Sequence, residues 1–83
     1  MKTETLIEVY NTFDDTFVAE FVVDSPTLKQ LIEIIPPKPQ DSGYYSPVKL
    51  NNNQLDLLEV RVNGLSKYLS REYECYLRTV AIR

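Results

Sequence analysis

Few side chains in this chain can carry chemistry, and most of those that can are carboxylates. There is no His, the only thiol is Cys75, and the one Ser-Lys pair is Ser66-Lys67. A nucleophile needs a nearby base to activate it, and adjacent residues of a strand point in opposite directions, so Ser66 and Lys67 have no geometric basis for partnership. Cys75 lies among alternating apolar residues, where a free thiol usually acts as a small core side chain. We therefore expect no nucleophilic catalysis.

The carboxylates form two pairs of the kind used in acid–base chemistry. Asp14 and Asp15 are adjacent, and Glu8 and Glu20 lie on two segments expected to pair. Paired carboxylates serve glycoside hydrolysis, but that reaction needs a substrate cleft, which is hard to build in 83 residues. A structural zinc site needs four Cys or His ligands, the acids lack the spacing of a calcium loop, and the two glycines stand apart rather than in a phosphate-binding loop. The sequence thus predicts a protein that is not an enzyme and holds neither metal nor cofactor.

Charge is distributed unevenly along the chain. Residues 1–37 hold seven acids and two lysines, a charge of −5, whereas residues 38–83 hold five acids and seven bases, a charge of +2; the two sum to the net −3. There is no basic footprint for phosphate, so nucleic-acid binding is disfavoured. An acidic first half attracts a basic protein partner and speeds the encounter. The alternative is that these acids only keep an edge hairpin soluble.

Length and composition indicate one globular domain over residues 1–83, with 43% apolar and 25% charged residues. A single Cys excludes an internal disulfide, so the core alone must hold the fold. No apolar run approaches the roughly 20 residues that a membrane span needs. With no charged and hydrophobic leader and only one thiol, the chain is expected to be cytoplasmic.

The hydrophobic pattern predicts the element order ββαβαβ. Apolar residues alternate with polar ones in the strands and recur three and four positions apart in the helices. The expected elements are strands over 6–10 and 17–23, a helix over 25–35, a strand over 45–50, a helix over 52–63 and a strand over 73–82. The short Asn/Asp turn after the first strand predicts an antiparallel hairpin. The expected fold class is α+β, a small single-layer antiparallel sheet with helices on one face.

Clear start and stop signals mark the first helix. Ser25 is suited to the N-cap, and Pro26 to the first helical position, where its missing N–H costs nothing. Pro36-Pro37 ends the helix, because the residue before a proline is pushed out of the helical region. The apolar stripe at helical spacing comprises Leu28, Leu31, Ile32 and Ile35.

The segment 52–63 has two interpretations. Leu58 and Val62 follow helical spacing after a run of Asn residues suited to capping, and Gly64 stands where a helix C′ residue is wanted. Leu58, Val60 and Val62 also alternate with polar neighbours, and the Asn-Gly pair that follows is a strong hairpin signal. The resemblance described below favours the helix.

Alternation assigns the strand residues to two faces of the expected sheet. The face toward the helices is expected to carry Phe17, Ala19, Phe21 and Val23 with Ile7 and Val9. The opposite face then carries Leu6, Glu8, Tyr10, Val18, Glu20 and Val22, joined by Tyr76, Arg78 and Val80 if the last strand turns Cys75 and Leu77 inward. Such a mixture of apolar, aromatic and acidic groups is typical of an interaction site. The alternative is that a second layer, or a second copy of the chain, covers it.

The order of these segments resembles a known group of proteins. The resemblance is carried by Ile7-Glu8-Val9-Tyr10 with its Asn/Asp turn, the Phe-rich second strand, one short helix, Tyr44-Tyr45 before Val48, Asn53-Gln54, and the closing Tyr73-Glu74-Cys75-Tyr76-Leu77. Over most of its length the chain resembles small bacterial proteins of unknown function that are often encoded beside polymorphic toxins. Many of these look like immunity proteins of contact-dependent growth inhibition systems. The resemblance implies a protein with no cofactor and no catalysis.

The sequence therefore predicts a non-catalytic inhibitor that binds a toxin domain, a basic nuclease-type effector, and occludes its active or substrate-binding site. Acids of this chain would mimic the phosphates that the toxin binds, and Tyr side chains would fill the cleft of the toxin. Tyr suits this role because it brings a large contact area with few rotatable bonds. The expected contact residues are Glu8, Tyr10, Asp14, Asp15, Glu20, Tyr44 and Tyr45. Two alternatives stay open: a phage-encoded inhibitor of a host defence or transcription enzyme, and a structural homodimer built through the outer sheet face.

Overall fold

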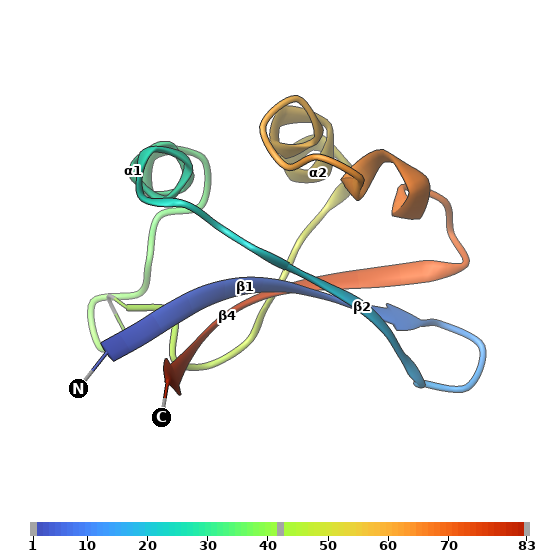
Figure 1. Cartoon of the computed structure of the whole chain (residues 1–83), viewed down its shortest axis with the longest axis horizontal. Coiled ribbons are helices and arrows are strands. Elements are labelled where there is room, and N and C mark those ends of the chain that lie inside the picture. The colour runs from blue at the N-terminus through green and yellow to red at the C-terminus, as the bar shows by residue number, and fades with distance from the viewer. Residues whose placement is uncertain (1, 42, 83) are drawn as a thin grey trace.

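The computed structural model describes residues 2–41 and 43–82, apart from the side chain of Ser25. The elements are β1 (Lys2–Asn11), β2 (Phe17–Val22), α1 (Ser25–Ile34), β3 (Val48–Lys49), α2 (Asn52–Glu59), the 3-10 helix η1 (Leu65–Tyr68) and β4 (Tyr73–Ile82). The strands form one antiparallel sheet in the order β2-β1-β4-β3, and both α-helices lie on the same side of it (Figure 1). The α+β fold class and the ββαβαβ order are confirmed, with the 3-10 helix added before β4.

The core lies between the sheet and the helices. In the central strands β1 and β4, alternate residues point toward the helices, and Ile7, Val9 and Leu77 are fully buried. Leu31 of α1 and Leu58 of α2 meet them from the other layer and are equally inaccessible. No helix among the described residues has both the length and the apolar composition needed to cross a membrane.

Helix α1 begins at the start of the predicted range, but its N-cap residue differs from the predicted one. Asp24, rather than Ser25, is the N-cap, and its carboxylate accepts the N–H of Thr27 at 2.9 Å. Asp and Ser are comparable caps, so the sequence alone does not choose between neighbours. The end before Pro36-Pro37 is confirmed. The predicted stripe is wrong at Ile32, which is 46% exposed.

Helix α2 confirms the helical interpretation of its segment and ends earlier than predicted. Leu58 is fully buried and Val62 is 7% exposed, whereas Val60 between them is 79% exposed, which is a helical and not a strand pattern. Asn51 and Gln54 form a reciprocal capping box at the start. Gly64 is not the helix C′ residue. It is the N-cap of η1 and has φ +94°, a left-handed conformation that favours glycine.

A β-bulge in the hairpin moves one predicted core residue to the other face. The register is regular up to Val9 opposite Ala19, and then shifts so that Tyr10 lies opposite Phe17. Val18 is thus the extra residue. The prediction that Phe17 faces the helices is therefore wrong: it shares a face with Tyr10 and is 54% exposed.

Strand β3 is much shorter than the strand predicted over 45–50. Only Val48–Lys49 pairs with β4. Before it, the Asp41 carboxylate accepts the N–H groups of Tyr45 and Ser46 at 2.9 and 2.8 Å, so this part of the chain is a turn. These two hydrogen bonds lower the pKa of Asp41 below its ordinary value.

Candidate functional site

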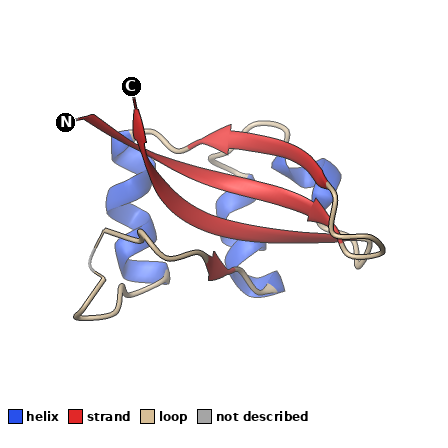
Figure 2. Ribbon diagram, turned by 90° about the horizontal axis from the view of Figure 1, so that it is seen from below, coloured by secondary structure: helices blue, strands red, loops and turns tan. Residues whose placement is uncertain are grey.

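The side of the sheet away from the helices, called the outer face below, is not covered by any described element (Figure 2). The registers of the three long strands place on it Leu6, Glu8, Tyr10, Phe17, Glu20, Val22, Glu74, Tyr76, Arg78 and Val80. Leu6 is only 5% exposed although it lies on this face, with Val22 and Arg78 directly beside it. The outer face therefore has its own small apolar layer, open to solvent around its margins.

The outer face contains a pocket of about 300 Å³, called the central pocket below. It is lined by Glu8, Tyr10, Asp15, Pro47, Glu74, Tyr76 and Arg78. The Tyr10 ring lies at its aromatic side, with its centroid 5.8 Å from that of Tyr76 and 5.8 Å from that of Phe17, both edge to face. Edge-to-face packing of this kind stabilises the arrangement of the three rings.

The charges of the central pocket are only partly compensated. Glu8 pairs loosely with Arg78, Oε1 to Nη1 at 3.7 Å, and Glu74 pairs with Lys49, Oε1 to Nζ at 3.3 Å. The Tyr76 hydroxyl donates a hydrogen bond to Glu74 Oε2 at 3.1 Å. Burial raises the pKa of Tyr76, and the hydrogen bond and negative charge of Glu74 raise it further, so this phenol stays a donor at neutral pH.

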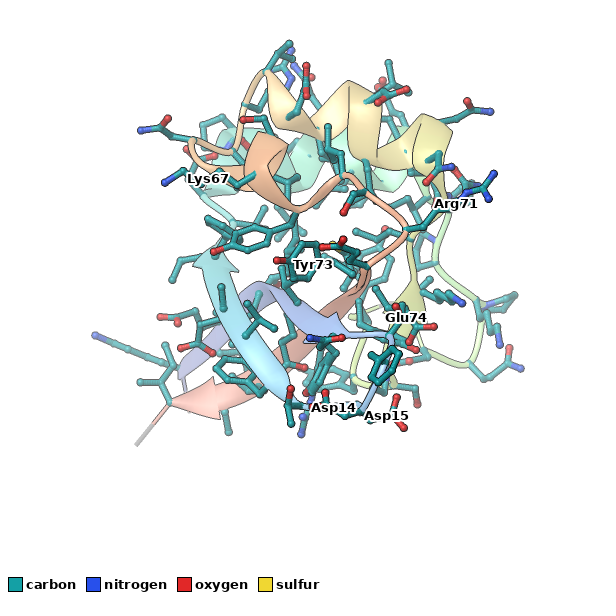
Figure 3. All side chains as sticks on the ribbon, turned by 90° about the vertical axis from the view of Figure 1, so that its right-hand side faces the viewer. Asp14, Asp15, Lys67, Arg71, Tyr73 and Glu74 are labelled. Atoms are coloured by element: carbon teal, nitrogen blue, oxygen red, sulfur yellow. The ribbon has the colours of Figure 1, made fainter. Side chains whose placement is uncertain are left out.

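The turn between β1 and β2 places two more acids beside the central pocket (Figure 3). Asp14 holds the turn by accepting the N–H of Thr16 at 3.1 Å and its hydroxyl at 2.7 Å. The Thr16 hydroxyl is the main cause of the lowered pKa of Asp14. Asp15 has φ +58°, a left-handed conformation that Asp and Asn tolerate better than most residues, and it lines the pocket.

Two carboxylates lie side by side at the β1–β2 end of the outer face. Glu8 and Glu20 are direct cross-strand partners. Like charges in that position destabilise a sheet. Glu8 has Arg78 as its counter-ion, but Glu20 is exposed and makes no ion pair or side-chain hydrogen bond within the part of the chain that the structure describes.

Tyr44 lies in the core and not on the surface, which corrects its expected role as a contact residue. It is 2% exposed, its hydroxyl donates to the Ile35 carbonyl at 2.6 Å, and its own carbonyl accepts the N–H of Thr79 at 2.9 Å. Burial raises the pKa of its phenol. Tyr44 therefore ties the proline-rich loop to the end of α1 and to β4, and a partner cannot reach it while the fold is intact.

Tyr45 is 60% exposed but does not line the central pocket. Its ring lies over Gly43, where an added Cβ would come within 2.5 Å of Tyr45 Cε2. The glycine thus provides the close approach on which this ring position depends. Tyr45 remains accessible, at a separate place from the pocket.

The structure brings together three of the seven predicted residues, Glu8, Tyr10 and Asp15, in the central pocket. Glu20 adjoins them on the outer face, and Asp14 lies next along the turn. The pocket is also lined by Glu74, Tyr76, Arg78 and Pro47, which are not among the predicted contact residues. The sequence does place Tyr76 and Arg78 on the outer face. Alternation along β4 puts Glu74 on the same face as these two residues.

The described residues include one thiol, Cys75, and no cluster of acids suited to a metal ion. Cys75 is 1% exposed, and burial raises the pKa of its thiol to about 11, so it is neither a thiolate at neutral pH nor open to substrates. Across residues 2–41 and 43–82, no three acidic or thiol side chains gather closely enough to hold a metal ion. The expectation that the chain is not an enzyme stays a prediction.

Comparisons of the chain with protein-family models, with curated proteins and with solved structures gave no match.

Proposed function

We propose that the chain is an immunity-type protein, a non-catalytic inhibitor that binds a basic toxin domain of the nuclease type through its outer face. It would act in the cytoplasm, where a lone reduced thiol is ordinary. The proposal combines the resemblance of the segment order with the composition of the outer face. Binding would block the surface with which the toxin holds its own substrate.

The observation that carries the proposal is an uncovered sheet face with an aromatic centre and an acidic margin. Tyr10, Tyr76 and Phe17 form one edge-to-face row, while Asp15 and Glu20 stand beside it with no ion pair among the described residues. Tyr side chains in partly enclosed pockets are frequent anchors of protein interfaces. Acids at the margin attract a basic partner and set the rate of encounter.

A mechanism by occlusion follows from this arrangement. A nuclease binds the phosphates of its substrate with Arg and Lys side chains. Carboxylates spaced along the hairpin of this chain can form ion pairs with those same Arg and Lys side chains. The rigid rings of Tyr10 and Tyr76 would fill the space between them. No bond is made or broken, so the inhibition is reversible and depends on salt concentration.

The test uses the protein that co-purifies with the chain from its native locus. It measures how fast this protein associates with each of two matched charge-neutralising variants. The first variant is Asp15→Asn/Glu20→Gln, on the outer face; Asn is chosen because it tolerates the left-handed conformation at position 15. The control is Glu33→Gln/Asp56→Asn, on exposed positions of the two helices. Each variant changes the net charge from −3 to −1.

Association at low salt should slow by about tenfold for the outer-face variant and change little for the control. The co-purifying protein should also be toxic when expressed alone and harmless when expressed with this chain. If both variants associate equally slowly, the effect comes from net charge alone, which would contradict the proposal. So would a harmless partner, or sedimentation showing that a second copy of the chain occupies the outer face.

A further inference from the structure

The sheet has two edges, and the β2 edge is the less protected of them against pairing with another strand. At the other edge, Val48–Lys49 and single hydrogen bonds to Leu50 and Tyr44 cover β4. This short strand follows Pro47, which has no N–H to donate, and carries a Lys. Short length, Pro and Lys are the usual protections of an edge strand. The β2 edge is six residues long and contains neither Lys nor Pro.

The backbone of β2 is open on its free side. The Val23 N–H donates to the Thr5 carbonyl at 2.9 Å, so Val23 turns its hydrogen-bonding groups toward β1. Because these groups alternate along an antiparallel strand, the N–H and C=O of Glu20 and Val22 point away from β1. Within the described residues β2 has no other neighbour in the sheet, so these four groups can pair with an added strand.

Three side chains along this edge are apolar and exposed. The exposed fractions are 54% for Phe17, 38% for Val18 and 61% for Val22. The bulge at Val18 breaks the regular edge only at the turn end of the strand. From Ala19 to Val22 the edge is regular, and an added strand would cover apolar surface there.

Charge indicates what kind of strand would fit. Hydrogen-bonded and non-hydrogen-bonded pairs alternate along an antiparallel ladder. Val23 and Thr5 form a hydrogen-bonded pair, and the Glu8–Glu20 pair is three positions away, so it is a non-hydrogen-bonded pair. Side chains come closest together in pairs of this kind. Glu8 has a counter-ion and Glu20 has none among residues 2–41 and 43–82. A cationic side chain on an added strand would lie beside Glu20 and remove the repulsion.

We propose that the β2 edge takes up an extended, basic segment of the partner protein as a fifth strand of the sheet. Main-chain hydrogen bonds to Glu20 and Val22 hold the segment, and a Lys or Arg beside Glu20 selects it. This inference depends on the proposed function in one respect, that the partner is basic. It differs in location, since the edge binds backbone and the central pocket binds side chains.

The first experiment uses a capped synthetic peptide of alternating Val and Lys, titrated at millimolar concentration into the isotope-labelled chain and followed by NMR. A matched peptide of alternating Val and Glu is the control. We expect saturable shifts of the Glu20 and Val22 amides with the Lys peptide, and at least about tenfold weaker binding of the Glu peptide.

Two variants keep the inference falsifiable. Val22→Pro removes an N–H that points away from β1, so no hydrogen bond to β1 is lost. Edge strands accept Pro at such positions. This variant should not bind the peptide. Glu20→Lys leaves the backbone edge intact and reverses its charge, so the preference should invert toward the Glu peptide. This second variant gives a readable result even if the first fails to fold.

Several results would overturn the inference. They are no binding of either peptide, equal binding of both, shifts at Tyr10 and Tyr76 without shifts at the β2 amides, and concentration-dependent shifts at β2 without peptide. The last result would mean that a second copy of the chain occupies the edge. If Val22→Pro leaves partner binding unchanged while Asp15→Asn/Glu20→Gln weakens it, the proposed function stands and the edge inference alone fails.

Discussion

The two faces of the sheet are built from the same strands but held in different ways. On the helix side, Ile7, Val9 and Leu77 are completely buried against two helices. On the outer face, Glu8 is held by a 3.7 Å ion pair, and Tyr76 by a 3.1 Å hydrogen bond and the edge-to-face ring of Tyr10. The core therefore lies on one face, while the other face keeps exposed side chains.

The largest expected effect comes from the buried face. Leu77→Ala removes a side chain with no solvent exposure and leaves a cavity, so the free energy of unfolding should fall by about 2–5 kcal/mol. Val80→Ala, three positions along on the outer face, is the matched control and should change it by less than about 1 kcal/mol. Urea denaturation of both variants measures the difference. Equal losses would remove the contrast between the faces.

A second comparison uses the adjacent tyrosines. Tyr44→Phe leaves the buried Ile35 carbonyl without its hydroxyl donor and should cost about 1–3 kcal/mol. Tyr45→Phe changes an exposed ring and should have an effect within about 0.5 kcal/mol. Thermal or urea unfolding separates the two. A harmless Tyr44→Phe would mean that the hydroxyl does not tie the loop to α1.

A third prediction concerns a charge that works against the fold. Glu20→Lys replaces a like-charge cross-strand pair with an opposite-charge pair and should stabilise the free chain by about 0.2–1 kcal/mol. The same change should weaken binding of the basic partner. Unfolding and association measured on one preparation test both. Stabilisation without any loss of binding would leave Glu20 with no role in recognition.

The smallest effect is expected at the exposed turn. Hydrogen bonds from Thr16 lower the pKa of Asp14 below 3.8, so the unfolded chain binds the proton more readily than the folded one. Stability from this carboxylate is fully present above pH 3.8 and is lost as pH falls through the lowered pKa. Asp14→Asn should therefore be slightly less stable than the parent at pH 7, with the difference shrinking toward pH 3. A constant difference in urea titrations would contradict this cause.

Sequence reasoning predicted the architecture well because alternation and helical spacing are local signals. The strand over 73–82 is confirmed at both ends, and the helix that begins at Asn52 is confirmed as a helix. The errors lie at element ends, such as the short β3, and where a single residue decides. A bulge at Val18 turned Phe17 outward, and Asp24 took the cap expected of Ser25.

The candidate site was less predictable than the fold, because it depends on which strands become neighbours. Glu8 and Tyr10 were selected from their own strand, whereas Glu74 and Tyr76 reach the pocket only because β4 pairs with β1. Tyr44 shows the opposite case. Its residue type suits an interface, but a left-handed backbone at φ +60° and a hydroxyl bond direct it into the core.

The most direct test of the account is methyl cross-saturation NMR on the chain bound to its co-purified partner. Val22 and Val80 report on the outer face, while Ile32 and Leu57 are exposed reporters on the helices. The account predicts that saturation of the partner passes to Val22 and Val80 and leaves Ile32 and Leu57 unaffected. Saturation of the two helix residues with none on the outer face would contradict it.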